Sequence, residues 1–225
     1  MRKIIYLSLV FLILGIASCK KQNTQTPEVI PPVQEPNYYP LEIGNYWVYE
    51  NYRLKDGQEE LMAELDSIIV VKDTMIRYER YFILDCFIEP FGSKKIRILR
   101  DSMGYITDPY GRLSFTMNNL GDIFYHSIQY DNDGDTAVYQ ELSIHPELES
   151  LSLAIGDFEA INRITDFILF PGSNQPDSLV YRSTDAHFID GIGQATDFLF
   201  YASGSMSFEK QLLRYHIEPL IIIND

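Results

Sequence analysis

Three carboxylates at alternate positions, in the phrase Asp-Asn-Asp-Gly-Asp, form the most metal-like motif of the sequence. Asp131, Asp133 and Asp135 could converge on Ca²⁺, because an EF-hand loop opens with oxygen ligands at this spacing. The rest of the loop does not match the EF-hand pattern, since Thr136 stands where glycine is required and Leu142 where the bidentate glutamate belongs. Asp-Gly between two alternating runs is also a strong hairpin signal. The sequence therefore favours a plain hairpin, with a weak calcium site at the three aspartates as the alternative.

Other reactive residue types are present but lack the neighbours that catalysis needs. Cys86 lies in an apolar run without a histidine or basic cluster to lower its thiol pKa, which predicts a small buried core residue. The four histidines show neither an i, i+4 pair nor a metal-ligand spacing with cysteine; they are His126, His145, His187 and His216. Serine-nucleophile signatures, the dinucleotide fingerprint and the P-loop are missing. We expect no catalytic residue and no cofactor, and an enzyme is the less favoured class.

The N-terminus carries an export signal that ends at a cysteine. Arg2 and Lys3 precede an apolar run over 4–14, and small residues lead from it to Cys19. The run is too short to span a hydrocarbon core about 30 Å thick, and it is typical of a secretory signal peptide. The ending Ile-Ala-Ser-Cys resembles the bacterial lipobox, in which the thiol receives a diacylglyceryl group before cleavage. This resemblance implies that residues 1–18 are a lipoprotein signal peptide and that lipidated Cys19 anchors the chain to a membrane.

The segment 19–37 is predicted to be a flexible tether. It contains four prolines and many amides but few residues able to build a core. Residues 38–225 are then expected to form one β-rich globular domain, long enough to bury a core without disulfides. Once Cys19 is acylated, Cys86 is the only cysteine left, so no intramolecular disulfide can form.

The strongly acidic composition excludes one class of partner. The formal net charge is −14, and cleavage removes Arg2 and Lys3 but no acidic residue, so the mature chain carries −16. Nucleic acids and anionic lipid surfaces bind positive charge. Nucleic acid is therefore excluded, and the membrane is expected as a partner through the N-terminal lipid.

Beyond residue 38, β-branched and aromatic runs separated by turn signals predict a mainly β fold. Strands are expected at 46–52, 67–76, 77–89, 95–100, 103–107, 112–117, 122–130, 136–144, 178–189, 196–203 and 207–217. The aromatic run at 46–52 alternates poorly, which favours a strand buried on both faces over one with exposed aromatic side chains. Two short helices are predicted, at 59–65 from helix-forming residues and at 146–153 with proline at its first position. We expect a single antiparallel domain: a curved sheet, a sandwich or a partial barrel.

A repeated phrase marks turns that launch strands. The pattern L-x-I-G-[ND]-aromatic occurs at 41–46 and 153–158, and Leu-Gly-Asp at 120–122 is a partial third copy. Glycine reaches left-handed backbone angles at little cost, and Asn or Asp can bond its own turn. The irregular spacing of the copies argues against a repeat architecture.

The segment 39–49, YPLEIGNYWVY, resembles the opening of a broad group of exported, uncharacterised bacterial proteins whose mature domains begin with YPL-x-(I/V)-G-N-x-W-x-Y. Later phrases fit in the same order, at 73–76, 81–84, 99–106 and 188–193. The resemblance covers most of residues 38–193. It implies an antiparallel β domain of the Gram-negative envelope, in a lipoprotein family without an established activity.

These features favour a membrane-anchored envelope lipoprotein whose β domain is a non-enzymatic binding or structural module, with an envelope protein or a glycan as its partner. Lys20 after the anchor favours the outer membrane, because Asp there is associated with inner-membrane retention. An acidic run typical of surface-exposed lipoproteins is missing after Cys19, which favours the periplasmic side. One alternative is a carrier of lipid or another hydrophobic ligand in a β cavity. The other is a hydrolase of envelope polymers, which would need carboxylates or histidines with perturbed pKa values in a cleft.

Overall fold

The structure, a computed structural model, describes residues 35–55, 57–88, 93–170, 180–200 and 206–219. The chain divides into two compact units, Met1–Glu35 and Pro36–Asp225, and every described strand belongs to the second. The predicted signal peptide, Cys19 and the tether as far as residue 34 lie outside the described residues. Within the described ranges, no helix combines the length and the apolar character needed to cross a membrane.

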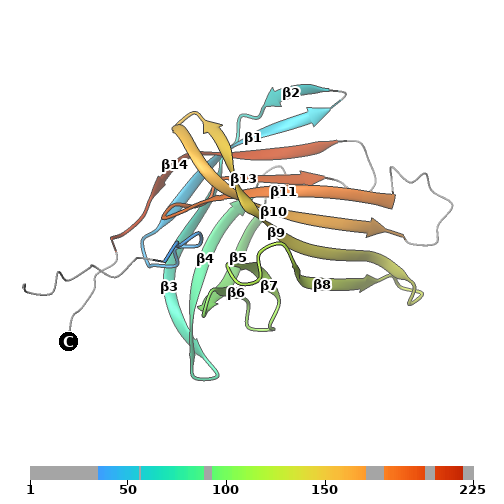
Figure 1. The fold of residues 1–225 in the computed structure, drawn as a ribbon, viewed down its shortest axis with the longest axis horizontal. Helices are drawn as coiled ribbons and strands as arrows, with labels where there is room; N and C mark the ends of the chain where they lie inside the picture. Colours follow the sequence, from blue (N-terminus) through green and yellow to red (C-terminus); the bar gives the residue numbers. More distant parts are fainter. Residues whose placement is uncertain (1–34, 56, 89–92, 171–179, 201–205, 220–225) are drawn as a thin grey trace, which may run out of the picture. The chain divides into compact units, whose positions relative to one another are not determined.

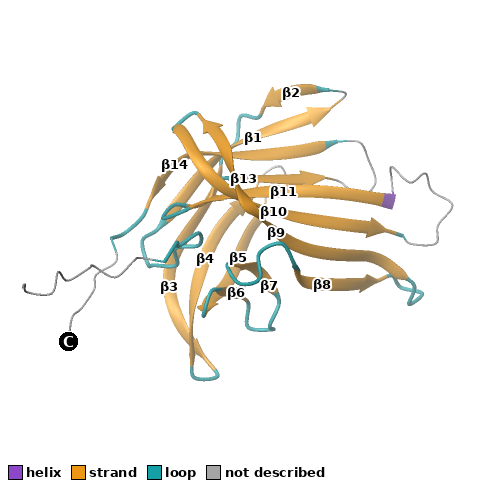
Figure 2. Ribbon diagram, viewed as in Figure 1, coloured by secondary structure: helices purple, strands orange, loops and turns teal. Residues whose placement is uncertain are grey.

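Fourteen antiparallel strands form two curved sheets in the described chain (Figure 1). The larger sheet has the order β13 (Thr196–Phe200), β14 (Ser207–His216), β1 (Tyr46–Lys55), β3 (Asp66–Ile76), β4 (Glu79–Ile88), β5 (Ser93–Ser102), β6 (Tyr105–Thr107) and β7 (Leu113–Thr116), with β2 (Gln58–Leu61) also paired to β1. The smaller sheet has the order β12 (Gly193–Gln194), β11 (Tyr181–Ile189), β10 (Gly156–Leu169), β9 (Thr136–Leu153) and β8 (Ile123–Tyr130). The predicted mainly β antiparallel architecture is confirmed (Figure 2).

The two sheets are joined at Ala195, between β12 and β13. Its amide donates to the His187 carbonyl in β11 at 2.7 Å, and its carbonyl accepts from the Leu212 amide in β14 at 2.8 Å. Backbone hydrogen bonds therefore continue from one sheet into the other. Trp47 of β1 adds a side-chain link, because its Nε1 donates to the Ile192 carbonyl at 2.6 Å.

Aromatic side chains from distant parts of the sequence fill the core between the sheets. The ring centroids of Phe115 in β7 and Phe188 in β11 lie 4.6 Å apart. Tyr39, from the segment before β1, lies 6.0 Å from each of these rings. Residues 47–49 of β1 are all buried, so this strand is covered on both faces here, as predicted.

The predicted strand-launching turns are confirmed. Gly44 has φ +100° and Gly156 has φ +138°, and β1 and β10 begin at or just after them. Asn45 is fully buried and holds its turn in place: its Nδ2 donates to the Pro40 carbonyl at 3.2 Å, and its Oδ1 accepts from the Glu218 amide at 2.8 Å. The asparagine of the repeated phrase therefore ties the first turn to the C-terminal segment.

The helix predicted at 59–65 is wrong. Gln58–Leu61 forms β2 instead, with Leu61 opposite Tyr52 of β1. The pairing extends one residue further, since the Met62 amide donates to the Asn51 carbonyl at 2.8 Å. A segment this short forms only a marginal helix on its own, whereas the edge of β1 offers partners for its backbone groups.

The helix predicted at 146–153 is also wrong, because these residues continue β9. They pair with the first part of β10, a strand of which only the initial turn was predicted. Pro146 lies at a bulge, where the register moves from Ala160 opposite Glu149 to Asn162 opposite His145. A bulge accommodates proline because an unpaired position needs no backbone N–H donor.

Candidate functional site

The loop with the three aspartates is the hairpin connection between β8 and β9. The Oδ1 atom of Asp131 accepts hydrogen bonds from the amides of Asp133 and Asp135, at 3.0 and 2.9 Å. The Asp131 amide donates to the Asp135 carbonyl at 2.9 Å, which closes the hairpin. The hairpin prediction is confirmed. Among the described residues, no group of three or more His, Cys, Asp and Glu side chains could hold a metal ion.

Cys86 is a buried core residue, as predicted. It lies in β4 with none of its surface exposed, and burial raises the pKa of its thiol. A raised thiol pKa lowers the thiolate fraction at neutral pH, and the thiolate is the nucleophile. Cys86 is therefore unsuited to catalysis.

The core leaves little room for a hydrophobic ligand. A void lined by Tyr39, Trp47, Tyr49 and neighbouring residues measures about 10 Å³. This is room for about one water molecule, whereas ligand pockets measure roughly 300–1,000 Å³. The interior formed by these side chains is thus filled, which counts against the carrier alternative.

Both sheets contribute buried charged side chains that the sequence did not single out. Lys210 of β14 has its Nζ atom 3.4 Å from Asp197 Oδ2 and 3.9 Å from Asp66 Oδ2. Arg163 of β10 lies 3.7 Å from Asp197 Oδ1, and its guanidinium is 5.5 Å from the centre of the Phe188 ring. In a chain with 18 basic and 32 acidic residues, the sequence does not distinguish these four from solvated charges. They hold β3, β10, β13 and β14 together.

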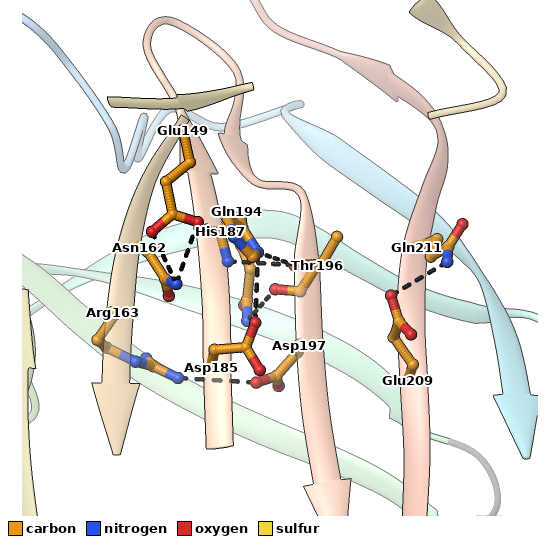
Figure 3. Close-up of polar contacts among 10 residues, drawn as sticks. All are labelled: Glu149, Asn162, Arg163, Asp185, His187, Gln194, Thr196, Asp197, Glu209 and Gln211. Atoms are coloured by element: carbon orange, nitrogen blue, oxygen red, sulfur yellow. Dashed lines mark hydrogen bonds and ion pairs between the residues drawn. The ribbon is translucent and has the colours of Figure 1, made fainter. Parts of the chain in front are cut away.

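A histidine-centred polar cluster lies where the two sheets join (Figure 3). The Nε2 atom of His187 is 3.1 Å from Glu149 Oε2, and its Nδ1 atom is 2.8 Å from Thr196 Oγ1. The Nδ2 atom of Asn162 is 3.3 Å from Glu149 Oε1. Asp185 approaches His187 Nδ1 at 3.7 Å. Strands β9, β10, β11 and β13 each supply a side chain to this cluster.

The order Thr196, His187, Glu149 contains the residue types of a nucleophile, a base and an orienting acid. Thr196 is 5 % exposed, however, and its hydroxyl also accepts the His187 backbone amide at 3.2 Å. A nucleophile must be reachable by its substrate, and this one is covered. The hydrogen bond from His187 lowers the pKa of Glu149, which keeps the carboxylate charged. The cluster links strands at the junction of the sheets, and Thr196 is not placed to act as an accessible nucleophile.

A continuous apolar row crosses the outer face of the smaller sheet, the face opposite the one that buries Ile144 and Phe188 in the core. Strand register places Ile128 opposite Tyr139, Tyr139 opposite Ile168, and Ile168 opposite Tyr181. These four residues, from β8, β9, β10 and β11, are called the apolar row. Ile128 and Tyr181 are 45 % and 61 % exposed.

A second row of polar side chains runs beside the first on the same face. The register pairs His126 with Glu141, Glu141 with Asp166, and Asp166 with Ser183; these four residues are called the polar row. The Tyr139 hydroxyl donates to Glu141 Oε1, which connects the two rows, and this hydrogen bond raises the pKa of Tyr139.

A hollow of about 310 Å³ lies over the parts of both rows that belong to β9, β10 and β11. The residues that line it are Tyr139, Glu141, Asp166, Phe167, Ile168, Tyr181, Arg182 and Ser183. Its volume is at the lower end of the range of small-ligand pockets, about 300–1,000 Å³. Alternation within 122–130 and 136–144 could have identified the outward-facing residues of two strands. The rows themselves need the register with β10, which was not predicted.

Comparison with protein-family models gives no match, and comparison with curated proteins gives none either. Two solved structures are similar in their backbone course. One is a protein assigned as a lipoprotein from Parabacteroides distasonis ATCC 8503, with 13 % identity and a TM-score of 0.46 over 82 % of this chain and 100 % of that chain. The other is a protein assigned as exported, with a YmcC-like fold, from Bacteroides fragilis NCTC 9343, with 11 % identity and a TM-score of 0.42 over 81 % of this chain and 100 % of that chain. At these scores the likeness identifies neither a family nor a binding site for this chain.

Proposed function

We propose that this protein is a lipid-anchored lipoprotein of the cell envelope whose β domain is a non-enzymatic binding module. Its binding surface is the outer face of the smaller sheet, centred on the apolar row. The anchor is lipidated Cys19, and the compartment is the periplasmic side of the outer membrane. The sequence features that support this location are the signal peptide, the lipobox-like ending and Lys20.

The observation that carries the binding assignment is the apolar row itself. Four large side chains from four strands share one outward face, and three of them, Tyr139, Ile168 and Tyr181, border a hollow of about 310 Å³. Exposed contiguous apolar surface marks interaction sites, because leaving it in water is unfavourable. Tyrosine suits such a surface, since its ring provides contact area and its hydroxyl provides a hydrogen bond.

The described interior supports binding at the surface over enclosure of a ligand. Its void near Trp47 holds about 10 Å³, and the hydroxyl of Thr196 in the histidine-centred cluster is covered. Neither the carrier nor the hydrolase alternative gains a specific observation from these residues. The proposed surface needs neither a large internal cavity nor an activated nucleophile.

A sedimentation assay tests this function. Full-length lipoprotein in a polyoxyethylene detergent is mixed with detergent-washed, insoluble envelope material, so that partition through the lipid is suppressed. Wild type is expected to co-sediment saturably. Tyr181→Ala should bind about tenfold more weakly, the typical cost of truncating an aromatic anchor.

The matched control is Tyr78→Ala. Tyr78 is 97 % exposed and lies in the turn between β3 and β4, away from the smaller sheet. Its variant should bind as wild type does. Equal binding by Tyr181→Ala and wild type would show that the apolar row is not the binding surface.

A further inference from the structure

Resting on the proposed binding surface, we infer that its ligand is an uncharged glycan, bound as an extended chain along the apolar row. The inference names a substrate class for the surface from the chemistry of the two rows. Three features support this ligand: ring faces along a line, hydrogen-bond acceptors beside them, and two rows that contain carboxylates but neither lysine nor arginine.

The tyrosines of the apolar row supply the stacking surface. An aromatic face carries partial negative charge and attracts the weakly positive C–H groups on the apolar face of a sugar ring. Tyr139 and Tyr181 lie on β9 and β11, with Ile168 of β10 between them. Neighbouring strands are about 4.8 Å apart, so the row from Ile128 to Tyr181 extends over about 14 Å. A linear chain of rings matches this shape better than a compact small molecule does.

The polar row supplies hydrogen-bond acceptors for sugar hydroxyls. Ionised Glu141 and Asp166 are acceptors only, and each carboxylate can take two hydroxyl donors at once. Ser183 both donates and accepts. Tyr139 donates to Glu141, which holds the ring and the carboxylate in a fixed relation before any ligand arrives. Such preorganisation reduces the entropy lost on binding.

The charge of this face selects against anionic ligands. Neither row contains lysine or arginine, and the adjoining row of Ser143, Ile164 and Asp185 adds another carboxylate. Arg182 of β11 also lines the hollow, but strand alternation turns its side chain toward the other face, where its guanidinium lies 5.3 Å from the centre of the Phe200 ring. Uronate, sialate and phosphate groups would therefore meet like charge here.

The size of the surface favours a glycan over a folded protein. A stable protein interface buries about 800 Å² on each partner and concentrates its energy in a desolvated centre. The lining of the hollow of about 310 Å³ instead includes two carboxylates, Glu141 and Asp166, whereas the centre of a protein interface is depleted of charge. Carboxylates that accept several hydroxyl donors are at no such disadvantage with a sugar.

A glycan microarray with neutral, aminated and anionic polysaccharides tests the inference. Full-length lipoprotein is applied in a polyoxyethylene detergent, because maltoside detergents carry sugar headgroups that would compete. Wild type is expected to bind at least one neutral polymer and none of the uronate, sialylated or phosphorylated ones. The neutral polymer is then used in affinity electrophoresis to measure dissociation constants.

Two variants of the rows and one control make the outcome specific. Tyr181→Ala and Glu141→Gln should each weaken binding of the neutral polymer about tenfold, and Tyr78→Ala should leave it unchanged. Circular dichroism confirms that each variant is folded. A blank array, binding to anionic polymers, or full affinity in both row variants would overturn the inference.

The glycan inference and the proposed function fail in different ways. If Tyr181→Ala loses sedimentation with envelope material while the array stays blank, the surface stands and its ligand is not a glycan. If Tyr181→Ala keeps both activities, the surface itself is wrong.

Discussion

The Nζ atom of Lys210 lies 3.4 Å from Oδ2 of Asp197, and the two residues face each other across β14 and β13. The side chains are 7 % and 17 % exposed. Asp66, with a side chain 2 % exposed, approaches the same ammonium at 3.9 Å. One cation thus lies close to two carboxylates in a region that water barely reaches.

Lys210→Ala is expected to destabilise the protein by about 3 kcal/mol, because it removes a buried cation that lies close to Asp197 and Asp66. Urea denaturation, followed by circular dichroism, measures the change. The control is Lys94→Ala. The Lys94 side chain is 70 % exposed, and its Nζ atom lies 2.7 Å from Asp85 Oδ2. That change should cost less than about 1 kcal/mol. A Lys210 variant as stable as the Lys94 variant would contradict the account of the buried network.

Replacing Glu209 with glutamine is expected to stabilise the protein in a pH-dependent way. Burial raises the pKa of its carboxyl, and Gln211 Nε2 donates to Glu209 Oε1 at 3.0 Å, which opposes this shift. A carboxyl with a raised folded-state pKa binds more protons when folded, so stability falls as pH rises from the unfolded to the folded pKa. Glu209→Gln keeps an acceptor for Gln211 and removes the charge. The variant should be more stable than wild type at pH 8, and the difference should disappear below about pH 4.

Replacing Glu149 with glutamine should change stability in the opposite direction to the Glu209 variant. The hydrogen bond from His187 lowers its pKa, so the folded state binds fewer protons than the unfolded state. The resulting stability is present above the unfolded pKa and is lost as pH falls through the folded pKa. Glu149→Gln should therefore be less stable than wild type at neutral pH and equal to it in strong acid. Thermal unfolding of both glutamine variants from pH 2 to pH 8 checks the two predictions. Changes of Tm in the same direction at neutral pH would contradict them.

Gly193 is expected to tolerate no side chain. It has φ +107°, and a Cβ atom there would lie 3.2 Å from Trp47 Nε1, which donates to the Ile192 carbonyl. Gly134 has φ +86° with no atom within 4 Å of such a Cβ, so Gly134→Ala measures the backbone strain alone. This strain costs about 1–2 kcal/mol, and Gly193→Ala should cost more. Trp47 is the single tryptophan, so its fluorescence should change only in the Gly193 variant.

Cys19→Ala tests the anchor. Without the thiol, no diacylglyceryl group can be attached, and cells grown with radioactive palmitate should yield an unlabelled, unprocessed precursor. Cys86→Ala is the control, since Cys86 is buried and should not affect labelling. Label in the Cys19 variant would exclude lipidation at this residue.

Local signals in the sequence were sufficient for the fold class and several turns. The hairpin at 131–135 and the turn at Gly156 depend on residues next to one another, and both are present. The burial of Cys86 also follows from its apolar neighbours. Such features depend only on short-range backbone preferences and hydrophobic patterning, so they can be predicted from neighbouring residues in the sequence.

Long-range pairing decided the remainder. Residues 146–153 contain helix-forming residues, but β10 offers them backbone partners, and tertiary pairing overrides a short local preference. His187 meets Glu149 from 38 positions away, and the apolar row exists only because a bulge near Pro146 sets the register of β9 against β10. A shift of one residue would turn Tyr139 toward the core, since side chains alternate along a strand. The sequence alone thus determined the fold class and several turns, whereas the pairing of distant strands decided the form of segments such as 146–153 and which side chains share a surface.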